Sequence, residues 1–154
     1  MARKKRITKR VLFTTTVQVL QPFLHLEGWQ FKIRFRKSLK NTIADCEAMP
    51  EYKCATIRVD HTHLKQLTNS VVVSTALHEM LHCIVWPMGE LAVSLSKKDT
   101  TKLEICRQYE EGLVTHLELT LLPFAMAAVN EELRKKGYYQ VELDNGPIQI
   151  VHDP

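Results

Sequence analysis

The sequence predicts an α+β domain, in which a small mixed or antiparallel sheet packs on two to three helices. Two segments, residues 29–36 and 54–60, alternate apolar and polar side chains, which is typical of strands with one buried face. Two longer segments repeat apolar residues at helical spacing. We expect the first helix to begin at a cap on Asn69 or Ser70 and to end at Pro87 and Gly89, and the second to run from Asp99 or Thr100 to Pro123.

Composition indicates one globular domain. The chain has 154 residues, of which 45% are apolar and 25% charged, which is ordinary for a protein with a real core. Its net charge of +4 is uneven, because cations crowd residues 1–10 and 32–40. We expect a flexible basic arm over residues 1–10 and a single domain over residues 11–154. Such an arm can contact nucleic acid or an acidic partner, although a solubilising terminus accounts for it at least as well.

The sequence favours a cytoplasmic protein without membrane contact. Polar residues and Pro22 interrupt residues 11–26, so no apolar leader core follows the basic start, and no run has the length of a membrane span. The four cysteines form no C-x-x-C pair, and we interpret them as reduced thiols. Cys46 and Cys54 could form a loop disulfide in an exported protein.

The remaining segments carry weaker signals. Residues 11–26 fit either a β-branched strand or a helix whose stripe Pro22 interrupts. In residues 29–36 the aromatic and basic side chains fall on opposite faces, which favours a core strand over an RNA-binding surface. We expect a loop over 38–53, followed after the strand by a short helix or turn over 61–68 with solvated His61 and His63. A third helix is expected over 124–136, stopping at Gly137. Residues 138–151 are expected to form a strand, a turn and a strand.

The sequence His78-Glu79-Met80-Leu81-His82 lies within the first long helical segment. Two histidines four residues apart share one side of a helix, so both imidazoles can reach one metal ion. Glu79 is adjacent but turned away from that side, where a general base for a metal-activated water would stand. The alternative is a pair of core histidines satisfied by hydrogen bonds, with Glu79 in solvent.

A catalytic zinc ion takes three protein ligands and leaves one position open, so a third ligand is needed. On the second helix, Glu104, Glu111 and Glu118 are spaced by seven and share a polar face that we expect to point to water. Glu110 instead interrupts the apolar stripe, and a metal would remove the cost of burying its carboxylate. Glu110 is therefore our choice for the third ligand, with Glu111 and His116 as alternatives. Tyr109 could support an oxyanion.

The motif, followed after a loop by the helix that carries Glu110-Glu111-Gly112-Leu113-Val114-Thr115-His116-Leu117, resembles the small zincin metallopeptidases with a glutamate ligand. It is especially similar to the compact ones of phage and mobile-element genomes. The resemblance covers residues 29–122 and implies a zincin-like fold, Zn²⁺ held by His78, His82 and Glu110, and Glu79 as the base in peptide hydrolysis. It also implies that an edge strand just before the motif helix, here residues 54–60, holds a peptide or protein substrate as an added strand.

Two other functions stay open. A non-catalytic zincin-like scaffold could bind a protein or nucleic acid through the basic arm and the Arg-rich strand face. A deformylase-like zinc hydrolase is less well supported, because Cys46 and Cys54 do not lie in the glycine-rich motif that supplies a cysteine ligand in those enzymes.

Overall fold

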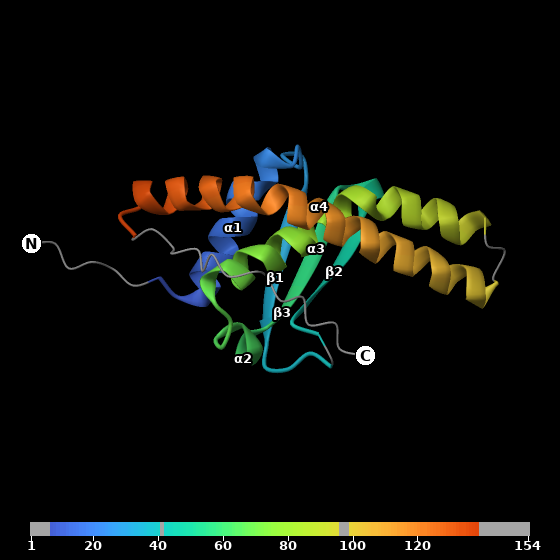
Figure 1. The fold of residues 1–154 in the computed structure, drawn as a ribbon, viewed down its shortest axis with the longest axis horizontal. Coiled ribbons are helices and arrows are strands. Elements are labelled where there is room, and N and C mark those ends of the chain that lie inside the picture. The colour runs from blue at the N-terminus through green and yellow to red at the C-terminus, as the bar shows by residue number, and fades with distance from the viewer. Residues whose placement is uncertain (1–6, 41, 96–98, 139–154) are drawn as a thin grey trace, which may run out of the picture.

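The computed structural model describes residues 7–40, 42–95 and 99–138. Figure 1 shows the elements, which in chain order are α1 (Lys9–Phe23), β1 (Gln30–Arg36), β2 (Ala44–Met49), η1 (Pro50–Tyr52), β3 (Cys54–Asp60), α2 (His61–Leu64), α3 (Asn69–Leu95) and α4 (Thr100–Lys135). The expected α+β class is confirmed. The strand, turn and strand expected over 138–151 lie outside the described residues, except for Tyr138. Helix α1 begins at Lys9, within the range expected for the basic arm.

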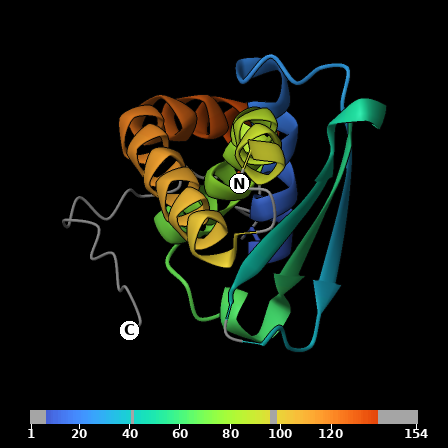
Figure 2. The same ribbon diagram turned by 90° about the vertical axis from the view of Figure 1, so that its right-hand side faces the viewer.

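The molecule is layered. Figure 2 shows the sheet on one side, α1 and α3 against one of its faces, and α4 beyond them. In the sheet β3 is central, since it pairs with β1 in parallel and with β2 antiparallel. The core lies between the sheet and α1 and α3, and its largest fully buried side chains include Phe13, Leu20, Ile57, Leu77 and Met80.

The central position of β3 corrects one expectation. Residues 54–60 were expected to form an exposed edge that takes a substrate strand, but hydrogen bonds to β1 and β2 occupy both of its sides. The edge that packs along α3 is β2 instead. This strand was expected to be loop, because Pro50 and the polar residues around it resemble turn chemistry. Its inward residues, Ala44, Cys46 and Ala48, are too small to give a strong apolar alternation.

Tertiary packing decides the ambiguous first segment. Residues 11–26 contribute to helix α1, whose buried side chains include Leu12, Phe13, Thr16, Val17 and Leu20 at helical spacing. The β-branched propensity of the threonines is therefore overridden by burial against α3. Pro22 lies in the last turn of this helix, which ends one residue later. At the far end of the sheet, Asp60 caps α2 by accepting hydrogen bonds from the backbone N–H groups of Thr62 and His63.

Both long helices pass through residues expected to end them. Helix α3 continues beyond Pro87 and Gly89, and α4 continues beyond Pro123, so the separate third helix is wrong. One proline costs about 3 kcal/mol in a helix interior, and packing between α3 and α4 along their length can offset that cost. Figure 2 shows α4 changing direction between its orange and red parts, as a helix with an internal proline does.

Helices α3 and α4 are both long and apolar enough to cross a membrane by length and composition. Two segments therefore reach the length of a membrane span, where the sequence was expected to contain none. The apolar window is 56% buried in α3 and 28% buried in α4, and core helices of soluble proteins pass the same test. Thr68 caps α3, one residue before the expected caps, because its hydroxyl oxygen accepts from the N–H of Val71. Asp99 caps α4 as expected.

Candidate metal centre

His78 and His82 lie on the side of α3 that faces α4. Their side chains are 26% and 16% exposed, so the rings sit at the edge of the core. Their Nε2 atoms are 3.3 Å apart. Zinc–nitrogen bonds of about 2.0–2.1 Å at tetrahedral angles put two ligand atoms about 3.3–3.4 Å apart. The one-turn spacing has therefore brought both rings to the separation that a shared metal ion needs.

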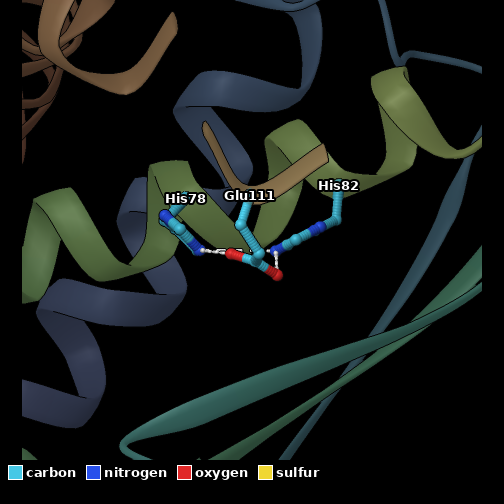
Figure 3. A group of neighbouring side chains, drawn as sticks. All are labelled: His78, His82 and Glu111. Carbon is cyan, nitrogen blue, oxygen red and sulfur yellow. Dashed lines mark hydrogen bonds and ion pairs between the residues drawn. The ribbon is translucent and has the colours of Figure 1, made fainter. Parts of the chain in front are cut away.

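Glu111 completes this group from α4. Its Oε2 is 3.5 Å from Nε2 of His78, and its Oε1 is 3.6 Å from Nε2 of His82. Figure 3 shows the carboxylate between the two rings. Among the described residues, these three are the group whose ligand atoms lie within 4.8 Å of one another. The side chain of Glu111 is 59% exposed, so the centre opens to solvent on the α4 side.

Glu110, our first choice from sequence, lies elsewhere. It is 21% exposed, so it is more buried than Glu111, as the apolar stripe indicated. Its Oε1 is 3.4 Å from Nδ1 of His82, behind the ring rather than in front of it. A Cβ built on Gly89 would come within 2.8 Å of Oε2 of Glu110. The carboxylate thus rests against the α3 backbone and contacts the outer nitrogen of His82, so the structure brings the alternative, Glu111, to the position expected for Glu110.

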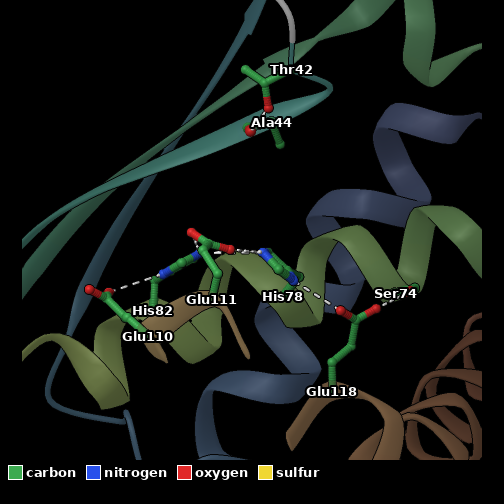
Figure 4. Close-up of polar contacts among 8 residues, drawn as sticks. All are labelled: Thr42, Ala44, Ser74, His78, His82, Glu110, Glu111 and Glu118. Carbon is green, nitrogen blue, oxygen red and sulfur yellow. Dashed lines mark hydrogen bonds and ion pairs between the residues drawn. The ribbon is translucent and has the colours of Figure 1, made fainter. Parts of the chain in front are cut away.

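Glu118 was missed by the sequence reasoning. The polar face of α4 was expected to point to water, yet Glu118 is only 14% exposed and its Oε2 accepts a hydrogen bond of 2.9 Å from Nδ1 of His78. Its other oxygen accepts from the hydroxyl of Ser74, one turn before His78 on α3 (Figure 4). The available signal was the seven-residue spacing of Glu111 and Glu118, which puts both on one side of α4.

The carboxylate contacts at Nδ1 of the histidines determine the protonation state of their Nε2 atoms. A carboxylate can only accept, so Nδ1 of His78 carries the proton and its Nε2 presents a lone pair when the ring is neutral. Metal-binding histidines usually have such a carboxylate behind them, which orients the ring and raises its basicity. Helix α4 therefore supplies one carboxylate in front of the rings and one behind each of them.

Glu79 lies on the neighbouring face of α3, about 100° around the helix from His78 and about 60° from His82, toward Cys46 of β2. It is 6% exposed. The pKa of Cys46 on that strand is raised by its hydrogen bond to Cys83 and by burial, and the negative charge of Glu79 adds to the rise. Burial raises the pKa of Glu79 to about 7, while the neighbouring His78 opposes the rise. Glu79 is therefore close to the histidine pair without belonging to the ligand group, as the sequence indicated.

The charges of the centre are strongly coupled. Burial lowers the pKa of His78, but hydrogen bonds to Glu111 and Glu118 and the charge of Glu79 outweigh it and raise that pKa to about 10. The same contact with His78 lowers the pKa of Glu111. In the metal-free protein a proton thus occupies the position where a cation would bind.

The other candidates lie outside the group. His116 is exposed on α4, and the side chain of Tyr109 is 79% exposed. His63 contacts Asp60, with Nδ1 3.0 Å from Oδ2, in keeping with a structural role at the α2 cap. The four cysteines are free, and the nearest neighbour pair is Cys46 with Cys83, at 3.7 Å, rather than Cys46 with Cys54.

Comparison of the chain with protein-family models, with curated proteins and with solved structures found no match. The assignment of a function to this centre therefore depends on its residues and their geometry.

Proposed function

We propose that the protein is a zinc-dependent metallopeptidase with a zincin-like arrangement, in which His78, His82 and Glu111 hold the metal. One observation supports this most: two Nε2 atoms at tetrahedral ligand spacing, with a carboxylate within 3.6 Å of both. Two nitrogens and one oxygen are the donor set of many hydrolytic zinc sites, which keep a position open for water. The exposure of Glu111 leaves room for a substrate on that side.

The residues of the centre would have separate roles in peptide hydrolysis. A bound zinc ion would supply a Lewis acid that acidifies a water molecule and polarises a carbonyl group. Glu79 would accept the proton of that water and pass it to the leaving amine, and a base works best with a pKa near the working pH. Glu110 and Glu118 would hold the two rings, and Ser74 would hold Glu118.

The strand that binds the substrate would be β2. The N–H of Asp60 donates to the carbonyl of Ile43, so by antiparallel alternation residues 44, 46 and 48 turn their backbone groups to the open edge. The carbonyl of Ala44 accepts from the hydroxyl of Thr42, at 2.5 Å, and Figure 4 shows both across from the histidines. Cys46 and Ala48 would then present the backbone groups that pair with an extended peptide.

The test is the substitution Glu79→Gln in the full-length protein. We expect zinc content to be unchanged and cleavage of an unfolded protein substrate, followed by mass spectrometry of the peptides, to fall by about 10²–10⁴-fold. The matched control is Glu104→Gln, an exposed carboxylate earlier on α4, which should leave the rate unchanged. Equal cleavage by the Glu79→Gln variant and the wild type would refute the proposal, as would absence of zinc from both.

A further inference from the structure

The outer face of the sheet carries a row of cations along β1. Lys32, Arg34 and Arg36 are exposed and alternate with the half-buried Phe31, Ile33 and Phe35, so all three point away from the helices. We call these three residues the β1 basic column. Figure 2 shows that α1, α3 and α4 all lie on the other face. The column therefore stands on an open surface, far from the face that holds the metal centre.

The cations of this column have no ion-pair partner within the described residues 7–40, 42–95 and 99–138. The next basic residue across the sheet, Arg58 of β3, is different. Its Nε is 2.5 Å from Asp45 and its Nη1 is 3.3 Å from Glu47, both on β2. The outer face thus carries a positive column on β1. Across the sheet, the carboxylates of Asp45 and Glu47 on β2 are partly neutralised by Arg58 on β3.

The shape of the charge selects its partner. Residues two apart on a strand are separated by about 6.6 Å, so the column extends over about 13 Å. A single small anion cannot contact all three cations, but a chain of regularly spaced anions can. A planar anionic membrane would also meet Asp45 and Glu47, which lie two strands away at about 10 Å and would repel it.

We propose that the β1 basic column binds the sugar–phosphate backbone of a nucleic acid. Two of its three residues are arginines, whose guanidinium groups suit bidentate contacts to phosphate. No base-reading groups are required, so binding is independent of sequence and dominated by charge. An extended single strand fits best, since it can follow the column without a second backbone over the acidic side. This surface is separate from the metal centre.

The experiment measures fluorescence anisotropy of a labelled oligothymidylate with the full-length protein. We expect a Kd no weaker than about 10⁻⁴ M, with an affinity that falls as salt increases, at a slope of about −0.7 for each phosphate contacted. With three contacts, log K against log salt should have a slope of about −2. A labelled duplex is the second ligand, and we expect it to bind more weakly than the single strand.

The variant replaces Lys32, Arg34 and Arg36 with Gln. It should weaken binding at least about tenfold and flatten the salt slope. The control replaces Lys102, Lys135 and Lys136 with Gln, which removes the same charge from exposed positions on and just after α4. Equal loss in both variants would show attraction to net charge alone and overturn the proposal, as would undetectable binding.

Two further measurements separate this proposal from others. Polyglutamate at equal charge should compete poorly, and complete competition would indicate an acidic protein partner instead. The Glu79→Gln variant should bind the oligonucleotide as the wild type does. That result would hold even if the protein proves not to be a peptidase, so the two proposals can fail separately.

Discussion

Two adjoining faces of helix α3 carry different groups of the candidate site. The side toward α4 carries the histidines and meets three carboxylates in direct contact with them. The face toward β2 carries Glu79, which is more buried than either histidine. Its negative charge contributes to the raised pKa of Cys46 on that strand. One helix thus presents the groups that would hold a metal and the group that would move a proton on two adjoining faces, about 60–100° apart. Each function should therefore be removable without the other.

The largest effect should follow His82→Ala. This change removes one of the two nitrogens of the centre, and two remaining ligands bind zinc poorly. We expect elemental analysis to find no stoichiometric zinc and cleavage to be abolished. Unchanged zinc content would show that the α4 side of α3 is not a metal centre. By contrast, Glu79→Gln on the adjoining face should keep the metal.

The next effect distinguishes the two adjacent glutamates. Glu111→Gln removes the oxygen donor in front of both rings, so zinc affinity should fall more than about 100-fold, beyond the usual effect of an outer partner. Glu110→Gln should cost less, because that carboxylate only contacts Nδ1 of His82. Titration with zinc against a chelating indicator measures both. The reverse order would restore Glu110 as the third ligand.

A smaller loss should follow Glu118→Gln. Removing a carboxylate behind a metal-binding histidine typically lowers metal affinity by about 10–100-fold. Ser74→Ala should cost less, because Glu118 keeps its bond to His78. If melting of the metal-free protein changes while zinc affinity does not, Glu118 is only a packing group.

The smallest effect is a dependence of zinc binding on pH. The pKa of His78 is raised to about 10 in the metal-free protein, so near neutral pH zinc must displace a proton. Below that pKa, each increase of one pH unit raises the fraction of neutral His78 about tenfold, so zinc affinity should rise about tenfold. Calorimetry in buffers of different ionisation enthalpy should detect about one proton released at neutral pH. Affinity that does not change with pH would contradict this.

Local chemistry made part of the molecule predictable. The alternation in residues 29–36 and 54–60 reports which face of a strand is buried, and β1 and β3 were found there. The one-turn spacing of His78 and His82 follows from helix geometry, whatever the helix packs against. The position of Glu79 off that side follows from the same geometry.

Other features depend on contacts between distant segments. Whether Glu110 or Glu111 stands in front of the histidines depends on how α4 is rotated against α3, and adjacent residues on a helix differ by about 100°. Glu118 looked solvated because seven-residue spacing shows which residues share a face but not what that face meets. The helices that continue through Pro87 and Pro123 depend in the same way on packing along their length.

The sequence by itself determined the α+β class, two of the strands, and a histidine pair with a carboxylate beside it, because these follow from periodicity within single segments. Only the tertiary structure decided which strand is the open edge beside the site and which carboxylates of α4 meet the rings. Those choices are set by the orientation of whole elements, which no pattern within one element encodes.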